Sequence, residues 1–291
     1  MSFLPAIRPT NESRRHRLRV AESVELQVEE WGPISGAPIL LCHGFGQTRG
    51  AWSSTAVRLA DAGYRCVSID LRGHGESDWL ENGAYVMDQF RDDLVAVTAW
   101  LGRPPVLVGA SMGGLLGLIA EGENAQSSLF RAMILVDVTP RWEAAGVERI
   151  IDFMRSNPDG FADFGEAASS IASYLPHRSR SKSPDRLRQL LVRRDDGRLR
   201  WHWDPNLLEM VSGEIERYQP RLFAATRAIK VPMLLVSGAA SDVVSRATID
   251  EFLQLAPHAQ HVSVAKATHI VVGDDNAAFT AKIGEFIASL H

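Results

Sequence analysis

Short apolar segments alternate along the chain with longer segments in which apolar residues recur every three or four positions. Residues 24–31 alternate apolar and polar side chains, as a strand with one buried face does, whereas residues 39–42 are entirely apolar. The predicted strands cover residues 24–31, 39–42, 66–70, 105–109, 133–138, 233–237 and 261–264. The predicted helices cover residues 52–62, 85–101, 115–121, 245–255 and 276–290.

Apolar strands that alternate with amphipathic helices indicate a mostly parallel, doubly wound sheet covered on both faces. The alternation stops in residues 140–230, which are polar, rich in arginine and poor in strand signals. We expect this insertion to form a small helical cap over the carboxyl edge of the sheet, and residues 1–139 and 231–291 to form the core. Residues 176–184 are expected to be an exposed connection within the cap.

Composition narrows the class of protein. The 291 residues carry a formal net charge of -4, which argues against a nucleic-acid partner. The one basic cluster, within residues 14–19, is interpreted as a solvated leader into the first strand. Cys42 and Cys66 lie in predicted strands and are expected to be buried thiols. With no apolar stretch long enough for a membrane span and no signal-peptide core, we expect a cytoplasmic enzyme that acts on a small molecule. The oligomeric state stays open.

The chemistry of the chain is indicated first by the pentapeptide 109–113, which fits the pattern G-x-S-x-G. It follows a predicted strand and precedes a predicted helix, which is the context in which this pattern forms a sharp turn that projects a serine hydroxyl above a sheet. Ser111 is therefore the candidate nucleophile.

Two further loops follow neighbouring strands. Residues 43–46 (His-Gly-Phe-Gly) are expected to supply one backbone N–H of an oxyanion hole, from Phe45, and Met112 the other. His43 is expected to have a structural hydrogen-bonding role. Residues 70–77 contain acidic, basic and histidine side chains, and the glycines among them favour a hydrogen-bonded loop that shapes the sheet edge over a catalytic one.

A serine nucleophile needs a base, and the base needs an orienting acid. Asp242 and His269 each follow a predicted strand near the end of the chain, on the same sheet edge as Ser111. Their order along the chain, serine, acid, histidine, is that of the α/β-hydrolases. Asp137, at the end of the strand after the nucleophile helix, is the competing acid, and we expect it to order the exit into the cap instead.

Together these residues resemble the α/β-hydrolase superfamily, in its serine esterase, lactonase and perhydrolase branch. The resemblance rests on HGFG, DLRGHGES, GASMGG and the Asp242/His269 pair. It implies an eight-stranded, mostly parallel sheet with a helical cap, and a catalytic triad of Ser111, Asp242 and His269. Epoxide hydrolases and haloalkane dehalogenases carry aspartate at the nucleophile position. Carbon–carbon bond hydrolases usually continue HGxG with glycine-proline-glycine, and this chain does not.

The resulting hypothesis is an enzyme that cleaves a small carboxylic ester or lactone through an acyl-enzyme, with no metal or cofactor. Carbon–carbon bond hydrolysis of a ring-cleavage product and ligand reception on a hydrolase scaffold are the alternatives. In the cap, Trp142, Trp201 and Trp203 are candidates for an apolar substrate pocket, and packing of the cap onto the sheet explains them equally well.

Overall fold

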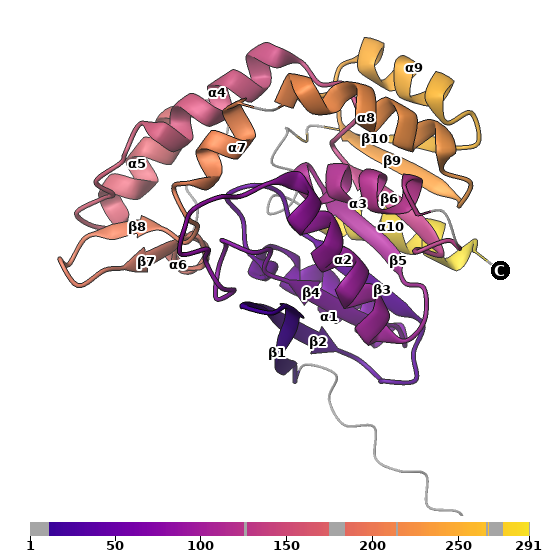
Figure 1. Cartoon of the computed structure of the whole chain (residues 1–291), viewed down its shortest axis with the longest axis horizontal. Coiled ribbons are helices and arrows are strands. Elements are labelled where there is room, and N and C mark those ends of the chain that lie inside the picture. Colours follow the sequence, from indigo (N-terminus) through magenta and orange to yellow (C-terminus); the bar gives the residue numbers. More distant parts are fainter. Residues whose placement is uncertain are drawn as a thin grey trace, which may run out of the picture.

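The computed structural model describes residues 12–124, 127–174, 184–213, 215–265, 267 and 276–290. Eight strands form one sheet in the order β1-β2-β4-β3-β5-β6-β9-β10, and the strands from β4 to β10 run parallel (Figure 1). β2 is antiparallel to both of its neighbours. The strands are β1 (Arg14–Ala21), β2 (Val24–Trp31), β3 (Pro38–Cys42), β4 (Arg65–Ile69), β5 (Val106–Ala110), β6 (Ala132–Val136), β9 (Met233–Gly238) and β10 (Gln260–Val264). The predicted mostly parallel sheet is confirmed.

Helices cover both faces of the sheet because its central strands are apolar on both sides. In β3, Ile39 and Leu41 belong to the core under α1 and α10, while Leu40 and Cys42 belong to the core under α2, α3, α8 and α9. The helices are α1 (Ser53–Asp61), α2 (Met87–Leu101), α3 (Met112–Gly122), α8 (Ile215–Ala228), α9 (Arg246–Leu255) and α10 (Asn276–Ala288). Both cysteines are buried free thiols, as predicted, and burial raises their pKa values.

The basic segment near the amino terminus is a strand and not a leader, so that prediction is wrong. Arg14 to Ala21 form the edge strand β1, which alternates half-buried and exposed residues against β2. The buried carboxylate of Glu30 explains the pairing, because Arg65 donates to it at 2.6 Å and Arg14 lies 3.3 Å away. Burial alone would raise the pKa of Glu30, but hydrogen bonds from Arg14 and Arg65 outweigh it and lower that pKa. The basic segment that the sequence pattern predicts to be solvated therefore holds β1 against β2 through Glu30.

A separate layer between β6 and β9 arches over the carboxyl edge of the sheet (Figure 1). Its helices are α4 (Ala144–Arg155), α5 (Phe164–Tyr174), α6 (Pro184–Leu190) and α7 (Leu207–Gly213), after which α8 returns to the core. It also contains an antiparallel hairpin of β7 (Leu191–Arg193) and β8 (Leu199–Trp201), which the strand-poor pattern did not predict. Each strand has three residues, too short to produce a visible alternation. Most of the predicted exposed connection at 176–184 lies outside the described residues.

A buried ion pair fixes the loop that follows β4. The guanidinium of Arg72 donates to the carboxylate of Asp93 on α2 through two hydrogen bonds, of 2.7 and 2.6 Å. The two side chains are only 5% and 1% exposed. Two parallel hydrogen bonds give this pair a defined geometry, and so the loop is held against the middle of α2.

We expect Asp93→Asn to lower the free energy of unfolding by about 3 kcal/mol, because the buried guanidinium would lose its counter-charge. The matched control is Asp92→Asn, since Asp92 pairs with Arg91 at the surface, and an exposed pair contributes at most about 1 kcal/mol. Denaturant unfolding of both variants is the measurement. Equal, small losses would show that the Arg72–Asp93 pair does not hold the loop.

Candidate active site

Ser111 occupies a strained turn between β5 and α3. Its backbone φ is 45° and its ψ is -119°, a conformation that non-glycine residues rarely adopt. The flanking glycines are needed for steric reasons. A Cβ atom on Gly109 would lie 2.7 Å from the carbonyl oxygen of Gly113, and one on Gly113 would lie 2.7 Å from the carbonyl oxygens of Cys42 and His43. The turn is therefore packed backbone against backbone.

A cavity of about 100 Å³ opens at Ser111, beneath the cap. Phe45 and Met112, the predicted oxyanion donors, lie in its wall, and so does Trp142. The other residues of the wall are apolar, except for Tyr218, which carries a phenol hydroxyl. The apolar residues are Met87, Leu115, Val138, Val147, Ile150, Ile151, Met210, Val211 and Val243. No charged side chain lines this cavity within the described parts of the chain.

Residues of the cap helices α4 and α7 line this cavity without having been predicted from the sequence. Val147, Ile150 and Ile151 come from α4, and Met210 comes from α7. They are ordinary apolar residues on amphipathic helices. Only the spacing of the apolar positions on α4 could have indicated a buried face, and that spacing does not say what the face covers.

The loop after β3 approaches the serine closely. A Cβ atom on Gly44 would lie 3.0 Å from the Cβ of Ser111, so this position leaves no room for a side chain. The backbone N–H groups of Gly46 and Gln47 are bonded, to His74 Nε2 at 3.2 Å and to the Gly44 carbonyl at 3.2 Å. Phe45 is thus held in a fixed turn. Met112 is the first residue of α3, a position whose N–H has no acceptor within its helix.

Two buried histidines connect this loop to the loop that follows β4. His43 accepts the N–H of Leu71 at its Nε2, 3.0 Å away, and its Nδ1 lies 2.8 Å from the Gly44 carbonyl. His74 accepts the Gly46 N–H, and its Nδ1 lies 3.1 Å from the Arg72 carbonyl. Burial lowers the pKa of His43 to about 4 and that of His74 to about 3. Both side chains are therefore neutral and structural, as predicted for His43 and for the second loop.

The two candidate acids lie in different surroundings. The carboxylate of Asp137 is buried and accepts the Gly238 N–H at 2.8 Å and the Ser241 hydroxyl at 2.7 Å. The side chain of Asp242 is 42% exposed and is hydrogen-bonded to Arg149 of α4. His269 lies outside the described residues. The choice of Asp242 over Asp137 therefore stays a prediction.

The three candidate tryptophans divide between two cavities. Trp142 lines the Ser111 cavity, whereas Trp201 and Trp203 line a second cavity of about 270 Å³ within the cap. The Trp203 ring packs on Phe45 with ring centroids 5.0 Å apart. Trp201 and Trp203 are therefore not among the residues that line the Ser111 cavity.

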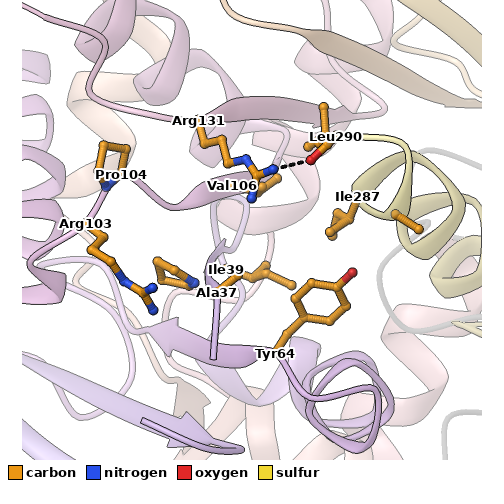
Figure 2. A pocket seen from close by; sticks show the side chains of 11 residues that line it. Ala37, Ile39, Tyr64, Arg103, Pro104, Val106, Arg131, Ile287 and Leu290 are labelled. Carbon is orange, nitrogen blue, oxygen red and sulfur yellow. Dashed lines mark hydrogen bonds between the residues drawn. The ribbon is translucent and has the colours of Figure 1, made fainter. Parts of the chain in front are cut away.

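A third cavity, of about 400 Å³, lies at the opposite edge of the sheet (Figure 2). Pro38 and Val106, in its wall, begin β3 and β5, while Ser111 follows the end of β5. Its two arginines, Arg103 and Arg131, donate to main-chain carbonyls. Ligands of open parallel sheets bind at the carboxyl ends of the strands, and so this cavity is not the candidate active site.

The parallel sheet, the cap and the serine turn define a hydrolase of the α/β type. A family model described as alpha/beta hydrolase fold matches residues 37–275, and the chain belongs to that family. It is similar to a 3-hydroxybutyrate-oligomer hydrolase from Cupriavidus necator, with 31% identity over 82% of this chain and 85% of the relative. It is also similar to a 2-(acetamidomethylene)succinate hydrolase from Mesorhizobium japonicum, with 27% identity over 85% and 86% of the two chains.

Solved structures resemble the whole fold. A crystal structure of E-2-(acetamidomethylene)succinate hydrolase superposes with a TM-score of 0.82, at 24% identity, over 96% of this chain and all of that one. The two chains therefore share the same fold. Among the residues described, no helix has the length and apolar character needed to cross a membrane.

We expect the free energy of unfolding to fall as the pH is lowered from about 6.5 towards 4. The unfolded chain protonates both imidazoles in this window, while His43 and His74 stay neutral in the folded protein because burial lowers their pKa values. Each histidine contributes a slope of up to about 1.4 kcal/mol per pH unit. Denaturant unfolding at several pH values, for wild type and His74→Gln, measures this slope. If the free energy of unfolding of His74→Gln had the same dependence on pH as that of the wild type, the interpretation of His74 as a buried, neutral histidine would be contradicted.

We expect Asp242→Asn to reduce kcat far more than Asp137→Asn. In a well-studied triad, replacing the acid by its amide costs about 10⁴ in kcat, because the amide fixes the wrong tautomer of the histidine. Asp137→Asn would instead lower the melting temperature, because Asp137 accepts hydrogen bonds from the loop that follows β9. Both variants are measured on one ester. A larger loss of kcat in Asp137→Asn, at an unchanged melting temperature, would transfer the acid role to Asp137.

Proposed function

We propose that this hydrolase is a serine esterase that cleaves a small carboxylic ester or lactone through an acyl-enzyme. The observation that carries the proposal is the position of Ser111, on a strained turn and in the wall of a cavity whose described residues include no charged side chain. A hydroxyl held in this way has few conformations to lose when it attacks a bound carbonyl.

In the proposed reaction, the Ser111 hydroxyl oxygen bonds to the carbonyl carbon, while His269 accepts the hydroxyl proton. The tetrahedral intermediate collapses, and His269 returns that proton to the departing alcohol. A water molecule then attacks the acyl-enzyme by the same route and releases the acid. Asp242 is the proposed acceptor for the second ring nitrogen of His269, and a carboxylate that bonds Arg149 through one oxygen can accept this bond through the other.

The negative charge of the intermediate forms on the former carbonyl oxygen. We assign its stabilisation to the backbone N–H groups of Met112 and Phe45, which lie on either side of Ser111 in the cavity wall. In well-studied proteases, loss of one such donor costs about 10² to 10³ in kcat. Because backbone N–H groups in a packed turn need no reorganisation, the tight contact between Gly44 and Ser111 supports this role.

The composition of the cavity wall favours a neutral, apolar acyl group. A carboxylate buried there would lack a cationic partner and would cost several kcal/mol to desolvate. A volume of about 100 Å³ accommodates a short acyl chain. The hydroxybutyrate-oligomer hydrolase supports ester chemistry, since oligomers of a hydroxy acid are joined by ester bonds.

We expect Ser111→Ala to abolish hydrolysis of 4-nitrophenyl butyrate and labelling by a fluorophosphonate, with the fold retained. Loss of the nucleophile in a well-studied serine hydrolase costs about 10⁶ in kcat. Ser169→Ala is the matched control, because Ser169 is an exposed residue of α5 whose hydroxyl bonds only its own helix among the recorded contacts. Retention of more than about a tenth of the wild-type rate in Ser111→Ala would overturn the assignment.

A further inference from the structure

The second cavity of the cap has a lining unlike that of the Ser111 cavity. Its volume is about 270 Å³, and the described residues of its wall include three arginines and three tryptophans but no aspartate or glutamate. These six residues are Arg155, Arg194, Arg200, Trp79, Trp201 and Trp203. Guanidinium and indole groups donate hydrogen bonds and accept none. A ligand that suits this wall must therefore bring acceptors, negative charge and an apolar body.

Two buried donors in this wall lack a partner. Trp201 is 8% exposed and Trp203 is 2% exposed. The indole nitrogen of each has no hydrogen-bond partner among the described residues. A buried donor without an acceptor costs about 1–3 kcal/mol. Both nitrogens are covered by protein atoms, so a ligand in the cavity would contact the tryptophan rings and not these N–H groups.

Two of these arginines, Arg194 and Arg200, make contacts that a bound ligand can replace or share. Arg194 lies over the ring of Trp79, 5.0 Å from its centroid. Arg200 pairs with Asp196 at 2.6 Å, and both of these side chains are more than a third exposed. An exposed ion pair of this kind contributes little free energy, and so Arg200 can turn to a bound anion at small cost.

This wall is rigid and lies directly behind the loop that carries Phe45. The main chain on either side of Trp203 is bonded to the loop after β4, because His202 accepts from Gly75 at 2.7 Å and Asp204 donates to Gly73 at 2.8 Å. A Cβ atom on Gly46 would lie 2.6 Å from the terminal methyl of Met154, another residue of this wall. The two cavities have no lining residue in common, and they adjoin where Phe45 of one packs on Trp203 of the other.

We propose that the tryptophan–arginine cavity of the cap is a second binding site, for the carboxylate of a small organic acid with a flat apolar body. The arginines receive the carboxylate oxygens, and the tryptophan rings cover the apolar body. This proposal goes beyond the esterase function and does not depend on Ser111 being a nucleophile. The Ser111 cavity holds the neutral acyl part of a substrate, whereas this one selects an anion.

The test is the binding of phenylacetate to the Ser111→Ala protein, measured by calorimetry and by tryptophan fluorescence. We expect phenylacetamide, which has the same shape without the charge, to bind at least about tenfold more weakly. The double variant Arg155→Gln/Arg194→Gln is expected to lose phenylacetate binding by at least about tenfold. Arg193→Gln, which removes one positive charge from an exposed neighbour outside the cavity wall, should retain it within about twofold.

Two sources could supply such a carboxylate, a free acid or the far end of a longer ester whose carbonyl lies at Ser111. The half-ester ethyl hydrogen 1,4-phenylenediacetate distinguishes them, because it carries a carboxylate and an ester on one ring. Tighter binding of the half-ester than of phenylacetate to Ser111→Ala assigns the site to the substrate's far end, and equal binding assigns it to a free acid. Equal binding of phenylacetate and phenylacetamide, or phenylacetate binding unchanged by the double variant, would overturn the proposal. Neither result depends on whether the protein hydrolyses esters.

Discussion

The close packing of backbone against backbone at the end of β5 is the constraint on which the rest of the site depends. Gly113 lies against the carbonyl oxygens at the end of β3, and Gly44 lies against Ser111 itself. These approaches leave no space for side chains, and they hold Ser111 at a positive φ that an isolated serine would avoid. The strain persists because the two central strands and their loops overdetermine the turn. A projecting hydroxyl and the first N–H of α3 are the geometric result.

Two neutral histidines connect the loop beside the serine turn to the loop that follows β4. His43 and His74 are buried, each bonded to backbone groups of two loops that are distant in sequence. Burial disfavours a charged imidazole at both positions and lowers both pKa values, and at His74 it outweighs the attraction of Asp70 and Asp204. The loop after β4 in turn bonds to the main chain around Trp203, so the cap hairpin is aligned with the loop that carries Phe45. One chain of hydrogen bonds thus relates the serine turn to both cavities.

The cap divides recognition into two chemically distinct spaces. Helices α4 and α7 cover Ser111 with apolar side chains, whereas the hairpin and the segment after it place arginines and tryptophans around a separate cavity. Ion pairs at the cap's return fasten this arrangement, since Arg221 of α8 pairs with Asp88 of α2 and Glu123 beyond α3. Because Ser111 lies on the core while the cap supplies part of each cavity wall, changes in the cap alone can alter which molecules reach the serine turn.

The sequence by itself determined the sheet, the serine turn and the structural role of His43, because each depends on local patterns: apolar strands, glycines at fixed spacing and a helix that follows at once. It did not determine β1, whose arginines look solvated until Glu30 is found buried beside them. Nor could it assign the cap tryptophans to a cavity, because identical aromatic residues line either space depending on how the cap helices cross the sheet edge. Those features arise from contacts between segments far apart in the chain, and only the tertiary structure decides them.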